Sequence, residues 1–321
     1  MPAEKDRLFH FPVPMFAIVM GLAGLTLVID ALGDPGTWIA TVADVLVVID
    51  LAVYALIAII YLAKAVRHPD AVRAEFNHPV KLSLFPTITI GLILLGTATL
   101  TRWPGLAHLL WGVGAAGHLV LTLMILSRWM HQDHFEIQHS NPAWFIPIVG
   151  NILVPIAGVP LGYETLSWFF FSTGLMFWPL LFAILMNRYF FHAPMPGKLM
   201  PTLFILIAPP ALGFLSWLAL HPGSLPDGFA LVLLNVGLFL TLLLVWQIAH
   251  FIRLPFALSW WAYSFPLAAI TLATLRMAEA SSDVFWNGLG MLLAVVTAVL
   301  IGALVVRTLV ATARGEICQP E

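Results

Sequence analysis

Apolar residues recur along the chain in blocks of about 20, long enough for an α-helix to cross the roughly 30 Å hydrocarbon core of a bilayer. Charged residues make up only 9% of the 321 positions, whereas a soluble domain carries about 25%. A soluble fold has too little polar surface to cover so much apolar chain. We therefore predict an all-α integral membrane protein in which residues 1–321 form a single transmembrane domain. The ten predicted spans are 11–32, 38–65, 84–101, 105–130, 143–161, 165–188, 199–220, 227–249, 259–278 and 284–310.

Lysine and arginine are distributed very unevenly between the two sets of loops that ten spans define. Arg102 and Arg276 fall on one side. The other set of loops, together with both termini, contains the remaining twelve: Lys5, Arg7, Lys64, Arg67, Arg73, Lys81, Arg128, Arg188, Lys198, Arg253, Arg307 and Arg314. Because cationic residues accumulate in cytoplasmic loops, we expect a multi-pass protein of the cell inner (plasma) membrane with both termini cytoplasmic. Residues 66–83 then form a cytoplasmic loop, and residues 311–321 form a cytoplasmic tail.

Ten spans with both ends on one side form five helical hairpins in a row, and proline is concentrated in the first helix of each hairpin. Proline removes a backbone hydrogen bond and bends a helix, and irregular backbone at membrane depth survives where protein or a water-filled cavity surrounds it. We therefore expect the five odd-numbered helices to form an inner ring around a pore, inside an outer ring of even-numbered helices. The alternative is that these prolines reflect only the general tolerance of membrane helices for proline. The prolines of the odd-numbered spans are Pro12, Pro14, Pro86, Pro147, Pro155, Pro160, Pro201, Pro209, Pro210 and Pro266, and the even-numbered spans have one interior proline, Pro179.

The odd-numbered spans carry no Lys, Arg, Asp or Glu in their central turns, so a pore between them would have neutral walls. Hydroxyl donors at the kinks and basic residues at the cytoplasmic ends would then favour anions. Phe265, beside Pro266, is a candidate for a hydrophobic gate of the kind that channels use. With 22 phenylalanines in the chain, a packing or lipid-facing role is the common alternative. The candidate pore-lining or kink residues are Pro14, Gly21, Pro86, Pro147, Asn151, Pro209, Pro210, Ser264 and Pro266.

Several short motifs resemble those of one membrane family. Residues 259–267 read Ser-Trp-Trp-Ala-Tyr-Ser-Phe-Pro-Leu and are similar to the ninth helix of the slow anion channels of plant guard cells. The wider group, the tellurite-resistance/dicarboxylate transporter family, includes TehA-like bacterial tellurite-resistance permeases and yeast malate and sulfite transporters. Nearly the whole chain is covered by the resemblance, whose further motifs are Val72-Arg-Ala-Glu-Phe-Asn-His-Pro-Val80, Asn141-Pro142, Gly150-Asn151, Leu161-Gly-Tyr163 and Ala208-Pro209.

The resemblance implies a homotrimer with one pore per protomer, lined by the five odd-numbered helices and blocked midway by a phenylalanine. By motif, that phenylalanine is Phe265. Members of the family carry chloride, nitrate, malate, sulfite or tellurite-related cargo, and a shared fold does not determine the cargo. The expected partners are therefore small inorganic or organic anions, the lipid bilayer and further copies of the chain. A net charge of −2 gives no reason to expect a nucleic-acid partner.

Two ionisable residues, Asp44 and Asp50, fall inside the second span. Such groups are costly at membrane depth and mark proton relays in transporters, so a coupled carrier could use either of them. They could equally pair with a neighbouring helix or with a hydroxyl at a trimer interface. An even-numbered helix belongs to the outer ring, which favours the structural role.

Histidines in two places have the chemistry of metal ligands. His108 and His118 lie in the fourth span, and we expect them to form hydrogen bonds between helices. The loop that follows contains His131, Asp133, His134 and His139, which we interpret as solvated residues. We therefore expect neither a bound metal nor another cofactor.

The sequence supports three functional hypotheses. The first is transport of small anions through a phenylalanine-gated pore, as an anion channel or uniporter. The alternative is a proton-coupled carrier that exports or imports C4-dicarboxylates, sulfite or tellurite-type oxyanions, with Asp44 or Asp50 titrating during transport. The third is an intramembrane enzyme, and we expect no enzymatic activity. The chain has no His-Glu-x-x-His or Gly-x-Ser-x-Gly motif, and its one cysteine, Cys318, lies in the tail.

Overall fold

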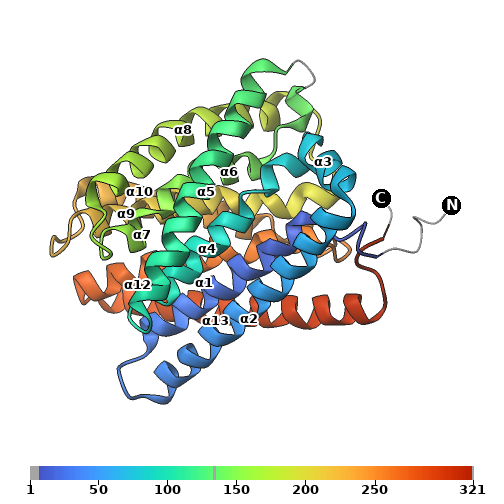
Figure 1. Cartoon of the computed structure of the whole chain (residues 1–321). Coiled ribbons are helices and arrows are strands. Elements are labelled where there is room, and N and C mark those ends of the chain that lie inside the picture. Colours follow the sequence, from blue (N-terminus) through green and yellow to red (C-terminus); the bar gives the residue numbers. More distant parts are fainter. Residues whose placement is uncertain (1–6, 133–134, 320–321) are drawn as a thin grey trace.

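The computed structural model describes residues 7–132 and 135–319, and this part of the chain folds into helices without a strand (Figure 1). The predicted all-α class is confirmed. The long helices are α1 (Phe16–Leu32), α2 (Trp38–Arg67), α4 (Thr87–Ala98), α5 (Pro104–His131), α8 (Glu164–Phe191), α9 (Ala208–Leu220), α10 (Gly228–Trp246), α12 (Ser264–Ser281) and α13 (Val284–Ala313). The short helices are α3 (Pro69–Asn77), α6 (Phe145–Val149), α7 (Pro155–Gly158) and α11 (Ile248–Phe251). The 3₁₀ helices are η2 (Val13–Met15), η3 (Lys81–Leu84), η4 (Ile137–His139), η5 (Pro142–Trp144), η6 (Gly150–Leu153), η7 (Gly197–Ile207) and η8 (Leu258–Tyr263).

Nine helical segments of the described residues are long and apolar enough to cross a membrane. They match nine of the ten predicted spans to within three residues at every end. The fifth predicted span, 143–161, is instead divided among η5, α6, η6 and α7. Pro147 and Pro155 each lack the N–H donor that a continuous α-helix needs, so the hydrogen-bond pattern changes type around them. Residues 142–158 thus form a shorter apolar helical segment, and the bends expected from its prolines take the form of changes in helix type.

The four other proline-rich spans share one construction, because each begins as a 3₁₀ helix and continues as an α-helix. The changes occur from η2 to α1, from η3 to α4, from η7 to α9 and from η8 to α12. Pro86 is the N-cap of α4, and Pro209 and Pro266 lie in the first turns of α9 and α12. The N–H groups of a first turn have no partner within the helix, so proline there removes no hydrogen bond. These prolines therefore mark the point where the helix type changes.

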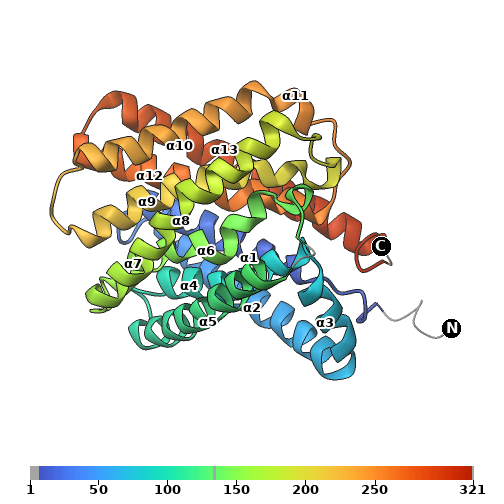
Figure 2. The same cartoon turned by 90° about the horizontal axis from the view of Figure 1, so that it is seen from above.

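Burial divides the spans into two groups. In the first span, 50% of the residues are buried inside the protein, and in each of the spans that end in α4, α9 and α12 the buried share is 72%. In α2, α5, α8, α10 and α13 only 22–39% of the residues are buried. Nearly every residue from 142 to 158 is buried as well. Seen from above, α1 and α6 lie between α5 on one side and α10 on the other (Figure 2). The proline-rich segments thus occupy the interior, and the straighter helices present apolar side chains outward.

Small residues allow neighbouring helices to approach one another closely. A Cβ atom added to Gly24 of α1 would lie 2.8 Å from the Cβ of Ala268 in α12. Similarly, a Cβ added to Gly114 of α5 would lie 2.9 Å from the backbone nitrogen of Ile93 in α4. Such distances are shorter than van der Waals contact, so glycine is needed for these helices to pack as they do.

The segment predicted as a cytoplasmic loop, 66–83, contains α3 and is attached to the spans by a buried ion pair. The Lys64 ammonium lies 2.9 Å from Glu75 Oε2 and donates to the carbonyl oxygen of Phe11 at 2.8 Å. The Tyr61 hydroxyl donates to the same carboxylate at 2.9 Å. Residues near 7 and 319 lie at the same end of the molecule (Figure 1), and a Cβ added to Gly315 would lie 3.0 Å from Arg7 Nη2.

Candidate functional site

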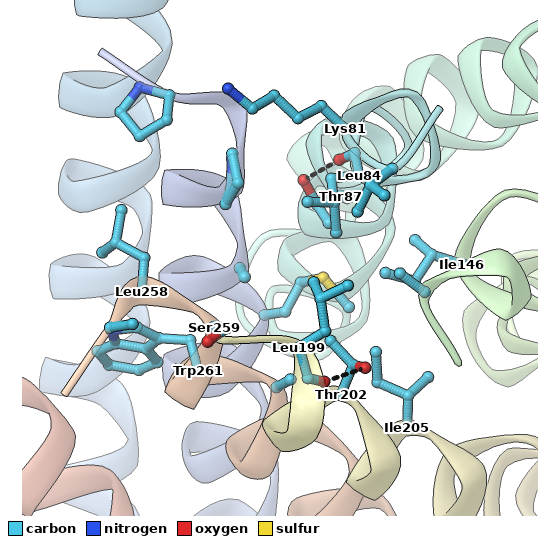
Figure 3. Close-up of a pocket in the computed structure, with 18 of the residues that line it drawn as sticks. Lys81, Leu84, Thr87, Ile146, Leu199, Thr202, Ile205, Leu258, Ser259 and Trp261 are labelled. Carbon is cyan, nitrogen blue, oxygen red and sulfur yellow. Dashed lines mark hydrogen bonds between the residues drawn. The ribbon is translucent and has the colours of Figure 1, made fainter. Parts of the chain in front are cut away.

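A cavity of about 730 Å³ lies at the end of the molecule where the described chain begins and ends. All five proline-rich segments contribute to its wall, mostly through the residues at which each segment starts. Figure 3 shows an open centre with Lys81, Leu84 and Thr87 on one side. The rest of the centre is surrounded by Leu258, Ser259, Trp261, Leu199, Thr202, Ile205 and Ile146. We call this space the large cavity.

Most of the wall of the large cavity is apolar, and two of its threonine hydroxyls are bonded to the backbone. The hydroxyls of Thr87 and Thr202 donate to the carbonyl oxygens of Leu84 and Leu199, both at 2.6 Å (Figure 3). Their protons are therefore already committed, and the expected hydroxyl donors for an anion are not supplied by these two residues. Two other hydroxyls of the proline-rich segments, those of Thr89 and Thr271, contact His118 and Thr297.

Basic side chains are the charged groups that predominate at the large cavity. Its lining includes Lys81, Lys198, His10 and His78, against one carboxylate from Glu316. His78 Nδ1 accepts from the backbone N–H groups of Val80 and Lys81 at 3.1 and 3.3 Å, which holds the start of η3. A concave surface with an excess of one sign of charge raises the local concentration of oppositely charged ions. The large cavity is therefore suited to attract anions.

A second cavity, of about 140 Å³, lies toward the opposite ends of the same segments. α1, α4, α9 and α12 each line it with residues from their later turns, and Leu153 and Ile156 line it from the interrupted segment. On α12 the residues that follow Phe265 on this wall are Ala269, Leu272 and Arg276, at the spacing of one helix face. We call this space the small cavity.

Three apolar side chains, Leu153, Leu212 and Phe265, line both cavities. They come from η6, α9 and α12, and Phe265 is only 8% exposed. The Phe265 ring packs against α1, because a Cβ added to Gly24 would lie 3.5 Å from its Cδ2 atom. These three apolar residues are shared by the two cavities, which therefore adjoin at this point.

The structure separates the predicted pore residues into two sets. Four of them line the large cavity, namely Pro14, Pro209, Phe265 and Pro266. The others lie outside both cavity walls: Gly21, Pro86, Pro147, Asn151, Pro210 and Ser264.

Packing accounts for the residues that do not reach a wall. Gly21 faces Ser264 in the contact between α1 and α12, where an added Cβ would lie within 2.8 Å of the Ser264 Cβ. The Asn151 amide donates to Thr122 Oγ1 at 3.0 Å and to the Ile148 carbonyl at 2.7 Å, which supports the interrupted segment from behind. Sequence reasoning missed Leu153 and Leu212, and no local signal distinguishes them from the many other leucines of the spans.

Neither candidate for a proton relay lines a cavity. Asp50 is buried and accepts a hydrogen bond of 2.6 Å from the Thr26 hydroxyl of α1. Asp44 lies near the start of α2, where its carboxylate is 2.5 Å from Arg102 Nε and its side chain is 61% exposed. Both carboxylates thus have partners in neighbouring elements, as the structural interpretation expects.

The histidines form local hydrogen bonds. His118 Nδ1 lies 3.0 Å from the Thr89 hydroxyl of α4, which is a contact between helices as expected. His108 instead bonds to the Pro104 carbonyl within its own helix, at 2.8 Å. His131 contacts the Ser127 carbonyl at 2.8 Å, and His139 Nδ1 accepts from the Glu136 N–H. Asp133 and His134 lie outside the described residues.

The two cavities adjoin at the residues they share, and comparison with known proteins shows to which family the chain belongs. Residues 10–309 match the voltage-dependent anion channel family. The chain belongs to this family. The resemblance seen in the motifs is therefore confirmed, and the protein is a multi-pass membrane protein of a group of anion channels and transporters.

Three relatives illustrate the range of the voltage-dependent anion channel family. The S-type anion channel SLAH3 of Arabidopsis thaliana is 27% identical over 331 residues, which cover 97% of this chain and 50% of that protein. The tellurite resistance protein TehA homolog of Haemophilus influenzae is 27% identical over 310 residues, covering 96% and 93%. The uncharacterized transporter MJ0762 of Methanocaldococcus jannaschii is 24% identical over 287 residues, covering 83% and 84%. The chain thus spans about half the length of the plant channel and most of the length of the two microbial proteins.

Proposed function

We propose that this protein conducts small anions passively across the membrane, as a channel or uniporter, through a pore that Phe265 closes. The observation that carries the proposal is the position of Phe265 with Leu153 and Leu212, on the walls of both cavities. An ion that enters the large cavity has only these apolar side chains between it and the small cavity. Displacement of the Phe265 ring would join the two spaces into one path.

The proposed architecture of the pore follows from the same segments. Nine continuous spans and the interrupted segment 142–158 together make ten passes, arranged as five hairpins in a single transmembrane domain. The greater burial of the proline-rich segments supports an inner ring of these five inside an outer ring of α2, α5, α8, α10 and α13. The lysine and arginine bias supports cytoplasmic termini, a cytoplasmic segment at 66–83 and a cytoplasmic tail from 311. By family resemblance, we propose that three copies assemble in the plasma membrane, each with its own pore.

Anion preference, in this proposal, originates at the large cavity. Lys81 and Lys198 lie on its lining, and Glu316 is the carboxylate beside them. Because the deeper wall of the large cavity is mostly apolar, an anion would meet a favourable potential at the entrance and few specific partners on the way to Phe265. Such a path passes several small anions, including chloride, nitrate and malate, and discriminates weakly between them.

A proton-coupled carrier for dicarboxylates, sulfite or tellurite-type oxyanions is the alternative. Coupling requires a titrating group that the transported species or its path can contact. Asp50 lies behind α1 and is bonded to Thr26, and Asp44 is paired with Arg102. Their positions away from the cavity walls favour uncoupled conduction.

Current recordings from purified protein in lipid bilayers test the proposal. We expect Phe265→Ala to raise the chloride, nitrate and malate current more than about tenfold over wild type, because it removes the ring from the constriction. Phe204→Ala is the matched control: Phe204 is also 8% exposed but lines neither cavity, so its removal should leave the current near the wild-type level. Folded Phe265→Ala protein without anion current, or with a cation-selective current, would refute the proposal. Saturable uptake that needs a pH gradient and is lost in Asp50→Asn would establish the carrier instead.

A further inference from the structure

The small cavity differs from the large one in its charged groups. Among the described residues, the charged side chains on its wall are Asp30 of α1 and Arg276 of α12. Arg276 turns partly to Glu279, with Nη1 2.7 Å from the carboxylate, and both side chains are about half exposed. Asp30, whose side chain is 37% exposed, thus brings a negative charge to the lining of the small cavity, and Arg276 brings a positive one.

Arg102 binds this carboxylate from outside the cavity. Its Nη2 atom lies 2.6 Å from Asp30 Oδ1, its Nε lies 2.5 Å from Asp44 Oδ1, and its Nη1 donates to the Ala98 carbonyl at 3.2 Å. The Arg102 side chain is only 15% exposed and lines neither cavity. One guanidinium in the connection between α4 and α5 thus joins carboxylates from α1 and α2.

Physical chemistry gives this contact a consequence for ions in the small cavity. A lone carboxylate on a narrow wall repels anions and attracts cations, and low-dielectric surroundings strengthen both effects. A guanidinium at 2.6 Å reduces that field at the distance of a passing ion, while it also balances part of the Asp44 charge. The hydrogen bond between Arg102 and Asp30 is the main cause that raises the pKa of Arg102 above its usual value. The positive charge of Arg102 therefore persists at every physiological pH.

We propose that Arg102 is a specificity-determining residue, which neutralises Asp30 and so allows anions, in preference to cations, to pass the small cavity. This inference rests on the proposed anion pore and adds a second point of selectivity to the basic large cavity. Asp44 is a positioning residue in this arrangement, because it binds the guanidinium and does not itself line the small cavity. The selectivity of the pore would then depend on a contact between residues 72 positions apart in the chain.

Reversal potentials in a potassium chloride gradient test the proposal, with every variant made in the Phe265→Ala background. Arg102→Gln should lower the chloride-to-potassium permeability ratio by about threefold to thirtyfold, the range expected for one uncompensated charge several ångströms from the ion path. Asp30→Asn should raise the ratio. The double variant Asp30→Asn with Arg102→Gln should return close to the parent, because both charges are gone.

Two comparisons separate the electrostatic effect from a structural one. The Arg102→Gln shift should shrink as salt rises from 0.02 to 1 M, since the Debye length falls from roughly 20 Å to 3 Å. Arg73→Gln is the matched control, because Arg73 also pairs with an aspartate, Asp70, but on exposed α3 away from both cavities. It should change the ratio less than about twofold, in line with the small effect of exposed ion pairs.

The outcomes distinguish this inference from the proposed function. If the Phe265→Ala parent carries no anion current, both fail. If the parent conducts anions but Arg102→Gln and Asp30→Asn leave the permeability ratio unchanged, the pore stands and the role of Arg102 is wrong. A shift in Arg102→Gln that persists at 1 M salt, or that the double variant does not reverse, would show a structural role instead. Should Arg102→Gln fail to fold, the predicted rise in Asp30→Asn decides the question alone.

Discussion

Replacement of Glu75 by glutamine should destabilise the protein markedly, because it leaves a buried positive charge without its partner. The Lys64 side chain is 2% exposed and that of Glu75 is 9% exposed, with 2.9 Å between ammonium and carboxylate. After Glu75→Gln, the ammonium keeps the Phe11 carbonyl at 2.8 Å as its strong acceptor. The remaining dipoles of the glutamine and of Tyr61 compensate only part of a full charge.

The size of the effect follows from this geometry. Removal of one partner of a buried ion pair costs about 3–5 kcal/mol. Because Lys64 retains one carbonyl acceptor, we expect the lower part of that range, about 3 kcal/mol. At about 2 °C per kcal/mol for a chain of this size, the melting temperature should fall by about 6 °C. Lys64→Met together with Glu75→Gln removes both charges and should recover at least about half of the loss.

Thermal unfolding of purified protein in detergent, followed by tryptophan fluorescence, measures these differences. Asp70→Asn is the control, since Asp70 pairs with Arg73 at 3.5 Å with its side chain 91% exposed, and the expected change is below about 0.5 kcal/mol. Glu75→Gln protein that melts within about 1 °C of wild type would refute the reasoning. A double variant less stable than Glu75→Gln alone would also contradict it, because the unpaired charge would then not be the cause.

Four further predictions test packing, coupling, thiol reactivity and topology. Gly114→Ala should lower the melting temperature by an amount that corresponds to about 1–3 kcal/mol of unfolding free energy. Gly112→Ala on the same helix should leave the melting temperature unchanged, because a Cβ added to Gly112 meets nothing within 4 Å. Equal effects of the two substitutions would contradict the packing argument. Asp50→Asn in the Phe265→Ala background should change the anion current less than about twofold, and loss of current would place Asp50 on the path. Burial raises the pKa of the Cys318 thiol, so less thiolate is present at pH 7.5 and maleimide labelling should be slower than in denatured protein, as a time course would measure. An impermeant maleimide should reach Cys318 from the cytoplasmic side only, and labelling from outside would reverse the topology.

Features that depend on neighbouring residues along the chain were predictable without a structure. Apolar block length predicted nine spans to within three residues, because bilayer thickness sets the length of a spanning helix. The concentration of proline in alternate spans indicated which segments are interior, since irregular backbone in a bilayer needs protein or water around it. The motif at 259–267 led to the family and to Phe265.

The interrupted segment shows where local reasoning begins to fail. Pro147 and Pro155 were recognised as helix-bending residues, but a bend and a full change of helix type have the same sequence signal. The surroundings decide between them. Here the Thr122 hydroxyl of α5 donates to the Pro147 carbonyl and accepts from the Asn151 amide, and these contacts arise only through the packing of α5 against this segment.

The cavities and their charges were decided by tertiary structure alone. Whether a residue such as Leu212 lines a path or lies behind it depends on the rotation of its helix against four others, which no periodicity in a uniformly apolar helix reports. The same holds for the contact between Asp30 and Arg102, 72 positions apart, because the lysine and arginine count assigns Arg102 to a side of the membrane but not to a partner. Composition and period are properties of one segment, whereas a constriction and a neutralised charge are properties of several segments packed together.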